Sequence, residues 1–477
     1  MGILSTGPIP KAFRYRFTQH RSDRRLLSRL AITLVLALAV EINVWADEIA
    51  ISVPSRAEVR MFGNNYQLFV NGNPFFIKGA GVGRYRLDEL AACGANSFRT
   101  WHTSSGIRSM LDHAARKGLY VTLGLDVARE RHGFNYDDKA AVARQLERVK
   151  KEVLKYKDHP AVIIWAIGNE LNLDATNMNV WDAVNDISKM IHAVDTNHLT
   201  TSPVAGVDAR VLGEIKTRAS DLDVLSIQVY ADIVNVPERL REAGWDGPYI
   251  ITEWGATGHW ESPQTGWGAP VENDSTTKAQ LYKSRYETII AADRKQCLGS
   301  YAFLWGQKQE RTPTWYGVFL ESGEATESVD VLQFLWSGNW PANRCPQIQG
   351  AWLDGKTSGE NIRLNPGKTY GAKITGSDPD GDPLDCSWEV MEESSAKTTG
   401  GDRESKPLVL PGLIQNPYAS EIVLQAPARP GAYRLFTYLR DGNGHAAHVN
   451  IPFYVNPDHS VQARSEQAFK PQQPISE

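Results

Sequence analysis

Cysteine is scarce in this chain, whose 477 residues include only Cys93, Cys297, Cys345 and Cys386. No two of them have the CxxC spacing, so the sequence carries no signature of a zinc site or a thiol redox centre. A disulfide is still allowed in an exported chain, and the candidate pair is Cys297 and Cys345, which lie just before a predicted strand and just after the next predicted helix. Four free thiols remain the alternative.

A large excess of one charge is also lacking. The chain has 51 Lys and Arg residues against 55 Asp and Glu residues, a formal net charge of -4, which provides no electrostatic attraction to nucleic acid. Its 42% hydrophobic content is ordinary for a globular protein with a large core and a second domain. Aromatic residues are plentiful, with 14 Trp and 17 Tyr, and such rings fill cores or stack on the apolar faces of sugars.

Long apolar runs are missing after the N-terminal region. The apolar stretch from Leu30 to Val40 follows a cluster of arginines, is too short to span a bilayer comfortably, and precedes Val44-Trp45-Ala46, which resembles a signal peptidase site. The pattern predicts a signal peptide over residues 1–46, export to the periplasm or the medium, and no membrane span after its removal. An uncleaved membrane anchor is the alternative.

Several catalytic and cofactor motifs are absent. No GxSxG elbow appears, which disfavours a Ser-His-Asp hydrolase. The segment from Gly79 to Gly83 is followed by Arg84 where GxGxxG needs its third glycine, which disfavours nucleotide binding. His102, Asp126 and His132 do not form a metal-ligand set, and no HxH follows the first strand. We therefore expect neither a cofactor nor a catalytic metal.

The middle of the chain alternates between apolar strands and helix-like runs such as Lys139 to Tyr156 and Thr276 to Ala292. Eight strand-helix units over this length predict an α/β protein with a (β/α)₈ TIM barrel, against the alternative of an open doubly wound sheet. The predicted barrel strands are Phe76 to Gly79, Asn96 to Trp101, Tyr120 to Leu125, Val162 to Ile167, Leu199 to Val204, Val224 to Tyr230, Tyr249 to Thr252 and Tyr301 to Trp305.

Two regions of β-structure flank the predicted barrel. Apolar residues alternate around Asn71-Gly72-Asn73 and predict a hairpin that precedes the barrel, both within residues 47–345. Residues 346–456 contain short alternating strands and turns, which predict a β-sandwich resembling the PKD-like and cadherin-like immunoglobulin modules of extracellular carbohydrate enzymes. Residues 457–477 are polar and predicted to be disordered. The aspartates of the sandwich at positions 378, 380, 382 and 385 could bind calcium, but capping of a Pro/Gly turn is favoured.

Two strands run directly into glutamates: VIIWAIGNE ends at Glu170, and YIITEWG contains Glu253. In a barrel of parallel strands the catalytic groups lie at the carboxyl ends of the strands, so both carboxylates are placed for chemistry at the same face. Cleavage of a glycosidic bond needs one protonated carboxyl to assist the leaving oxygen and one ionised carboxylate facing the anomeric carbon. This pair predicts such a reaction, and a salt-bridged barrel end is the alternative for either residue alone.

The motifs WAIGNE and ITEWG resemble those of glycoside hydrolase family 2 and its retaining clan, together with SFRTWH, QVY and FLWG on other strands. The resemblance covers roughly residues 59–340 and implies that Glu170 is the general acid/base and Glu253 the nucleophile. It further implies the following substrate-site residues: Asn169 on the sugar 2-hydroxyl, Arg99 and Tyr230 on Glu253, and His102 and Trp305 around the bond that is cut.

Other candidates come from position alone. Asp126 ends the third strand and is a candidate for binding a sugar hydroxyl, with capping of the following loop as the alternative. The loops after the seventh and eighth strands are rich in polar and aromatic residues, including Trp260 and Trp315, and predict several sugar subsites. Loops folded over their own aromatics are the alternative.

The sequence departs from the resemblance because no sugar-binding jelly roll or immunoglobulin-like domain precedes the barrel. A more open cleft, suited to an internal or transferase reaction, is therefore plausible. The expected function is a retaining β-glycoside hydrolase acting on a β-linked glucan or a related cell-envelope polysaccharide. A β-glucan transglycosylase and a noncatalytic polysaccharide-binding protein are the alternatives. A carbohydrate is the expected partner, and the sequence makes no prediction about oligomeric state.

Overall fold

The computed structural model describes residues 53–83 and 86–457. The predicted signal peptide and nearly all of the predicted disordered tail lie outside these residues. From Pro54 onward the chain is one compact unit, so the barrel and the strands that follow it belong together. Within the described ranges, no helix is both long enough and apolar enough to cross a membrane.

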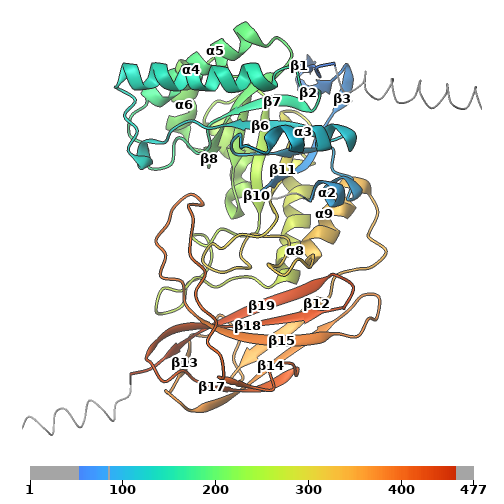
Figure 1. The fold of residues 1–477 in the computed structure, drawn as a ribbon, viewed down its shortest axis with the longest axis vertical. Coiled ribbons are helices and arrows are strands. Elements are labelled where there is room, and N and C mark those ends of the chain that lie inside the picture. Colours follow the sequence, from blue (N-terminus) through green and yellow to red (C-terminus); the bar gives the residue numbers. More distant parts are fainter. Residues whose placement is uncertain (1–52, 84–85, 458–477) are drawn as a thin grey trace, which may run out of the picture. The chain divides into compact units, whose positions relative to one another are not determined.

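A small antiparallel sheet precedes the barrel (Figure 1). It consists of β1 (Ala57–Phe62), β2 (Asn65–Val70) and β3 (Asn73–Phe75), so β2 and β3 form the hairpin predicted around Asn71-Gly72 and β1 adds a third strand. Asn71 and Gly72 turn the chain with positive φ values of 51° and 79°, as the predicted Asn-Gly turn requires. Apolar residues of this sheet pack against residues near the starts of barrel strands, so it covers the barrel end opposite the catalytic face.

Eight parallel strands close into a barrel in the order β10-β11-β4-β5-β6-β7-β8-β9, which confirms the predicted fold of this region. The six residues of β7 are all buried, as expected for a strand covered on both faces. The strands are β4 (Ile77–Val82), β5 (Ser97–Arg99), β6 (Tyr120–Leu125), β7 (Val162–Ile167), β8 (Leu199–Ala205), β9 (Val224–Gln228), β10 (Tyr249–Gly255) and β11 (Cys297–Trp305).

Helices surround the barrel, as Figure 1 shows. The predicted helix from Lys139 to Tyr156 is α4, which begins after Asp138 because that carboxylate accepts hydrogen bonds from the backbone N–H groups of Ala140 and Ala141. The α-helices are α2 (Leu87–Ala92), α3 (Ile107–Arg116), α4 (Lys139–Tyr156), α5 (Asn179–Val194), α6 (Ala209–Arg218), α7 (Val236–Glu242), α8 (Ser275–Arg285) and α9 (Glu327–Ser337). One π-helical turn, Tyr286–Ile290, continues α8.

Two four-stranded sheets follow the barrel, in the orders β12-β14-β17-β16 and β13-β19-β18-β15. Their apolar residues form one shared core, so the two sheets pack as a sandwich. The immunoglobulin-like class of this sandwich stays a prediction. The strands are β12 (Gln347–Leu353), β13 (Ile362–Leu364), β14 (Thr369–Ser377), β15 (Asp385–Glu392), β16 (Ile414–Gln415), β17 (Glu421–Gln425), β18 (Gly431–Arg440) and β19 (Ala446–Val455).

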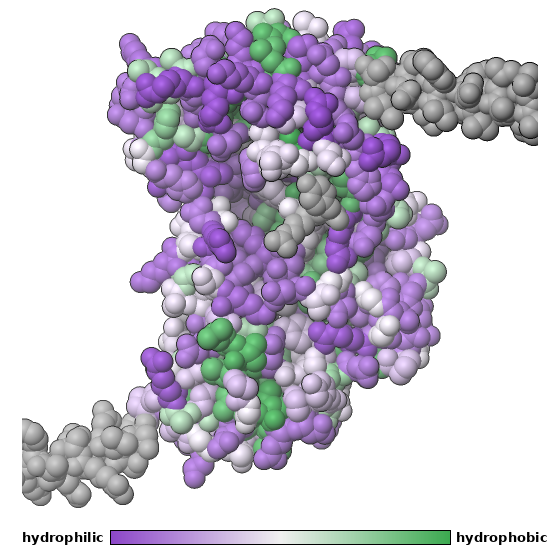
Figure 2. Space-filling model, in the orientation of Figure 1, coloured by the Kyte–Doolittle hydropathy of each residue, from purple (hydrophilic) through white to green (hydrophobic). Residues whose placement is uncertain are grey.

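On the face shown in Figure 2, polar residues predominate, and apolar residues gather over the lower part, where Figure 1 places strands of the sandwich. The sandwich contacts the barrel through specific polar groups. The Asn450 amide donates to the Glu272 carboxylate, and the His448 backbone N–H donates to Ser275 Oγ at 3.0 Å. These bonds hold β19 against the start of α8.

Candidate active site

Glu253 lies in β10 and is only 5% exposed. Its two carboxylate oxygens accept hydrogen bonds from four side chains contributed by neighbouring strand ends. The donors are Trp101 Nε1 at 2.7 Å, Gln228 Nε2 at 2.8 Å and Arg99 Nη1 at 3.3 Å to Oε1, and the Tyr230 hydroxyl at 3.0 Å to Oε2. A buried carboxyl group that accepts from one cation and three neutral donors is held in one orientation.

Arg99 hydrogen-bonds both to Glu253 and to Asn169, the residue before Glu170. The Arg99 guanidinium is fully buried and donates 2.8 Å to the Asn169 side-chain oxygen, which also accepts from Gln228 Nε2 at 2.7 Å. Because the oxygen of Asn169 takes both bonds, its amide nitrogen is the part that can donate to a substrate hydroxyl. Burial lowers the pKa of Arg99, while the charge of Glu253 opposes this effect.

Glu170 follows β7 and adopts a left-handed backbone conformation with φ of 50°. This conformation is uncommon for a residue with a side chain, and it is held by a bond of 2.9 Å from the Glu170 backbone N–H to the Pro203 carbonyl. Burial of the carboxyl, and second the negative charge of Glu253, raise the pKa of Glu170 to about 8. One carboxyl is therefore kept protonated near neutral pH beside another that is surrounded by donors.

Both glutamates line a cavity of about 1340 Å³ at the carboxyl ends of the barrel strands. This volume exceeds the roughly 300–1,000 Å³ of a pocket that takes one drug-sized ligand, so an oligosaccharide fits. Four of the predicted substrate-site residues line the same cavity: His102, Asn169, Tyr230 and Trp260. Trp260 is 57% exposed and meets the Tyr230 ring edge-on, which leaves indole surface open to a sugar.

Three predicted substrate-site residues lie elsewhere. Trp305 is fully buried and donates to the Arg86 carbonyl, and Trp315 is 2% exposed and donates to the Thr257 carbonyl. Both indoles therefore serve packing, because their N–H groups are already bonded below the cavity surface. The Asp126 side chain is 66% exposed, lies 3.7 Å from Arg148, and is not among the residues that line the cavity.

Trp101 and Gln228 were not among the predicted site residues, although each donates to Glu253. Trp101 comes two residues after Arg99, and Gln228 two residues before Tyr230, so their positions at strand ends were the available signal. Phe303 and Leu304, near the end of β11, line the cavity where Trp305 had been expected. Trp305 instead packs against Phe319 and Trp336, so the last residue of β11 belongs to the core.

The predicted disulfide between Cys297 and Cys345 is wrong, because all four cysteines are free and buried. Cys297 is the first residue of β11, where its thiol lies 3.7 Å from the Gly299 carbonyl, and Cys345 Sγ lies 3.3 Å from Asp330. Each thiol is therefore packed within its own surroundings. Burial raises the pKa of Cys297 to about 12, so this thiol stays protonated.

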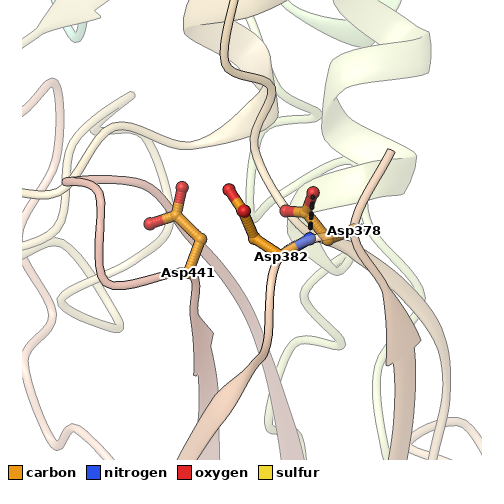
Figure 3. A group of neighbouring side chains, drawn as sticks. All are labelled: Asp378, Asp382 and Asp441. Atoms are coloured by element: carbon orange, nitrogen blue, oxygen red, sulfur yellow. Dashed lines mark hydrogen bonds between the residues drawn. The ribbon is translucent and has the colours of Figure 1, made fainter. Parts of the chain in front are cut away.

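Three aspartates of the sandwich lie close enough together to hold a metal ion. Figure 3 shows Asp378, Asp382 and Asp441, which each offer a carboxylate oxygen within 4.8 Å of the others. Most of these oxygens already accept hydrogen bonds: Asp378 accepts from the backbone N–H groups of Asp380 and Asp382, and Asp441 from Asn343 and His445. These bonds favour the prediction that the aspartates cap turns.

A family model matches part of the barrel. Residues 64–265 match the model described as "Glycosyl hydrolases family 2, TIM barrel domain". This region is therefore similar to that domain, and the closed eight-stranded ring agrees with the match.

Individual proteins match only part of this chain and only part of their own length. A β-galactosidase of Arthrobacter sp. (strain B7) is 31% identical over 107 residues, which are 20% of this chain and 10% of that protein. The structure of a Bifidobacterium dentium β-glucuronidase complexed with coumarin-3-O-glucuronide is similar at 19% identity and a TM-score of 0.47, over 59% of this chain and 49% of that one. A Parabacteroides merdae β-glucuronidase has 13% identity and a TM-score of 0.42, over 84% and 52%. The chain thus spans a tenth of the curated relative and about half of each solved structure.

Proposed function

We propose that this protein is a retaining β-glycoside hydrolase that acts on a β-linked glucan or a related cell-envelope polysaccharide. The observation that carries the proposal is the difference between its two carboxyls. Glu253 is surrounded by four donors, whereas Glu170 has a pKa raised to about 8 in the same cavity. A pair of carboxyls with opposite protonation states is what hydrolysis of a glycosidic bond requires.

The proposed reaction has two steps. A Glu253 oxygen attacks the anomeric carbon while Glu170 donates its proton to the leaving glycosidic oxygen, which produces a glycosyl ester on Glu253 and a free alcohol. Glu170, now ionised, then takes a proton from water, and the resulting hydroxide equivalent displaces Glu253 from the anomeric carbon. Asn169 donates to the sugar hydroxyl beside that carbon, and Tyr230 and Trp101 hold Glu253 for both steps.

Two of the four Lys and Arg side chains that line the cavity, Lys308 and Arg311, are engaged by groups of the protein; Arg129 and Lys397 also line it. Lys308 bonds to the Glu310 carboxylate at 2.7 Å and to the Gly401 carbonyl at 2.8 Å. Arg311 bonds to the Ala396 carbonyl and lies 4.0 Å from Glu404. Both cations are thus already paired within the protein, and a carboxylate on the substrate would have to displace these partners. A β-galactoside is a further neutral candidate, because the matching Arthrobacter protein is a β-galactosidase.

Chemical rescue tests the roles of the two glutamates. Glu253→Ala and Glu170→Ala should each lose most activity on a p-nitrophenyl β-glycoside chosen from a panel. Azide should then rescue Glu253→Ala with an α-glycosyl azide product and Glu170→Ala with a β-glycosyl azide product. The reverse pattern would exchange the two roles, and near wild-type activity of either variant would refute the assignment. Asp126→Asn is the matched control, because that carboxylate lies outside the cavity lining.

A transglycosylase is the second candidate, favoured by the exposed indole of Trp260 in a cavity with room for more than one sugar. A sugar hydroxyl would then replace water in the second step. Mass spectrometry of products from β-glucan oligosaccharides distinguishes the two, because products longer than the substrate require transfer. A noncatalytic polysaccharide-binding protein, the third candidate, would give no turnover with either. We also propose that residues 1–46 direct export and are then removed. N-terminal sequencing of the mature protein should therefore find that residues 1–46 are missing.

A further inference from the structure

A segment of the sandwich reaches the catalytic cavity. After β15 the chain leaves the sandwich at Glu393 and returns at Val409, which pairs with Met391. Figure 1 shows this excursion as the orange-red loop that extends from the sandwich toward the barrel. Residues 394–402, here called the strap, line the cavity that contains Glu170 and Glu253. Loops of this length without regular structure are usually functional when they are ordered.

Polar contacts fasten the strap to loops of the barrel. Asp402 lies 3.6 Å from the Arg131 guanidinium and 3.3 Å from the His132 ring, both in the loop after β6. The Gly401 carbonyl accepts from Lys308 at 2.8 Å, and the Ala396 carbonyl accepts from Arg311, both in the loop after β11. The strap is therefore held by loops that follow two different strands of the ring.

The strap also packs tightly at its tip. A side chain at position 400 would come within 2.6 Å of Leu173, in the loop after β7, and 2.8 Å of the Arg131 guanidinium. Glycine at this position thus permits the close approach. In the barrel order, β7 and β11 are four places apart in a ring of eight, so the strap contacts loops from opposite sides of the barrel mouth.

The strap lies on the side of the acid/base residue. Arg131 contacts the strap and also lies near Glu170. Its positive charge lowers the pKa of Glu170, although burial and the charge of Glu253 raise that pKa by more. An acid catalyst protonates the leaving oxygen, so the leaving group occupies the side of the cavity that holds Glu170. The strap contributes Ser395, Lys397 and Thr399 to the lining, and such polar side chains hydrogen-bond sugar hydroxyls.

We propose that the strap is the specificity-determining wall of the leaving-group subsite, so that the C-terminal sandwich contributes to selecting the sugar on that side of the bond. This inference rests on the proposed function. It replaces the expectation of an open cleft, because a segment that spans the barrel mouth limits the paths by which a long polysaccharide can enter. The same wall would bind the acceptor sugar in a transfer reaction.

The test replaces residues 395–402 with a short Gly-Ser linker and compares two substrates. Because a p-nitrophenyl group offers no sugar hydroxyls to the strap, kcat/KM on a p-nitrophenyl β-glycoside should change much less than kcat/KM on an oligosaccharide. The kcat/KM of the variant on an oligosaccharide of the same sugar should fall about tenfold or more, because the second sugar loses the wall. An unchanged ratio between the two substrates would overturn the inference. If wild type hydrolyses neither substrate class, the proposed function itself fails.

A point variant covers the case in which the shortened chain does not fold. Asp402→Asn removes the charge that lies against Arg131 and His132, and should raise KM for the oligosaccharide with little change for the p-nitrophenyl β-glycoside. Lys406→Met is the matched control, because it removes the ion pair with Glu321 at the exposed base of the same excursion. Equal effects of the two variants on the oligosaccharide KM would count against a wall formed by the strap.

Discussion

The indole of Trp101 donates a hydrogen bond of 2.7 Å to Oε1 of Glu253, the shortest of the four bonds that this carboxylate accepts. Trp101 also meets the Phe303 ring edge-on at a centroid distance of 5.8 Å, so packing orients the indole toward the carboxylate. The same oxygen accepts from Gln228 and Arg99, and the nucleophilic candidate is consequently held by groups from the ends of two other strands, β5 and β9.

Replacement of Trp101 by Phe removes this donor while keeping an aromatic ring. We expect kcat/KM to fall about 10- to 100-fold, because a hydrogen bond to a charged group is worth roughly 1.5–3 kcal/mol. Trp305→Phe is the control, since that indole donates to the Arg86 carbonyl outside the cavity lining. Steady-state kinetics on a p-nitrophenyl β-glycoside measures both, and an equal loss in the two variants would contradict a specific role for Trp101.

The raised pKa of Glu170 predicts the alkaline limit of activity. An acid catalyst works only when protonated, so kcat/KM should fall as the pH rises through about 8. Azide-rescued Glu170→Ala should lack this limb, because the group that titrates is gone. A limb that persists unchanged in the rescued variant would assign the titration to another group.

The charge of Glu253 contributes to the raised pKa of Glu170, after the larger contribution of burial. Glu253→Gln should therefore lower the pKa of Glu170 without removing the whole shift. Carbon-13 NMR of labelled glutamate carboxyls measures the titration directly and needs no activity. Asp126→Asn, an exposed carboxylate outside the cavity lining, should leave the titration in place. No change in the Glu253 variant would show that the two carboxyls are not coupled.

Glu170 should also lower the free energy of unfolding at neutral and alkaline pH. Its pKa is about 8 in the folded state against an ordinary value of 4.5, so between these values only the folded state keeps the proton. The free energy of unfolding then falls with rising pH through this window and is unaffected by Glu170 below it. Glu170→Gln should accordingly be more stable than wild type at pH 8, on the order of a few kcal/mol, because each unit of pKa difference is worth about 1.4 kcal/mol.

Urea unfolding of the wild type and Glu170→Gln at pH 8 and again at pH 4 measures the difference. The gain of the variant should be present at the higher pH and absent at the lower one. A gain of the same size at both values would point to altered packing rather than to ionisation.

A buried ion pair between Glu272 and Lys278 lies in the barrel where Asn450 of the sandwich contacts it, and it should be sensitive to the loss of one partner. Burial alone would raise the pKa of Glu272, but the charge of Lys278 at 2.5 Å, the charge of His448 and the bond from Thr312 leave it lowered to about 2. Lys278→Met leaves this carboxylate without its cation and should destabilise the protein by roughly 3–5 kcal/mol. The double variant with Glu272→Gln should recover part of the loss, and a purely additive result in thermal unfolding would contradict direct coupling.

Much of the barrel was predictable because parallel strands buried on both faces are short apolar runs. The predicted bounds of Tyr120 to Leu125 and Val162 to Ile167 coincide with β6 and β7. Asn169, Glu170 and Glu253 were identifiable for the same reason, since catalytic groups in this fold follow or end such runs. Trp305 shows the limit of such a prediction: a strand end specifies which residues are near the site, but packing against distant residues, here Phe319 and Trp336, decides whether a side chain faces the cavity.

Cys297 and Cys345 show another limit. Their positions relative to a strand and a helix were compatible with a disulfide, but each thiol is enclosed by its own neighbours, which depend on how β11 and α9 pack. Sequence distance to an element does not give the distance between two side chains.

The sequence by itself determined the barrel and pointed to the two candidate carboxyls, because strand periodicity and the residues that end each strand are local properties of the chain. Only the tertiary structure decided which groups surround them. The donors Trp101 and Gln228, the raised pKa of Glu170 and the strap at residues 394–402 all arise from contacts between segments far apart in sequence. Such contacts depend on ring closure and on the docking of the sandwich, which no local pattern in the sequence specifies.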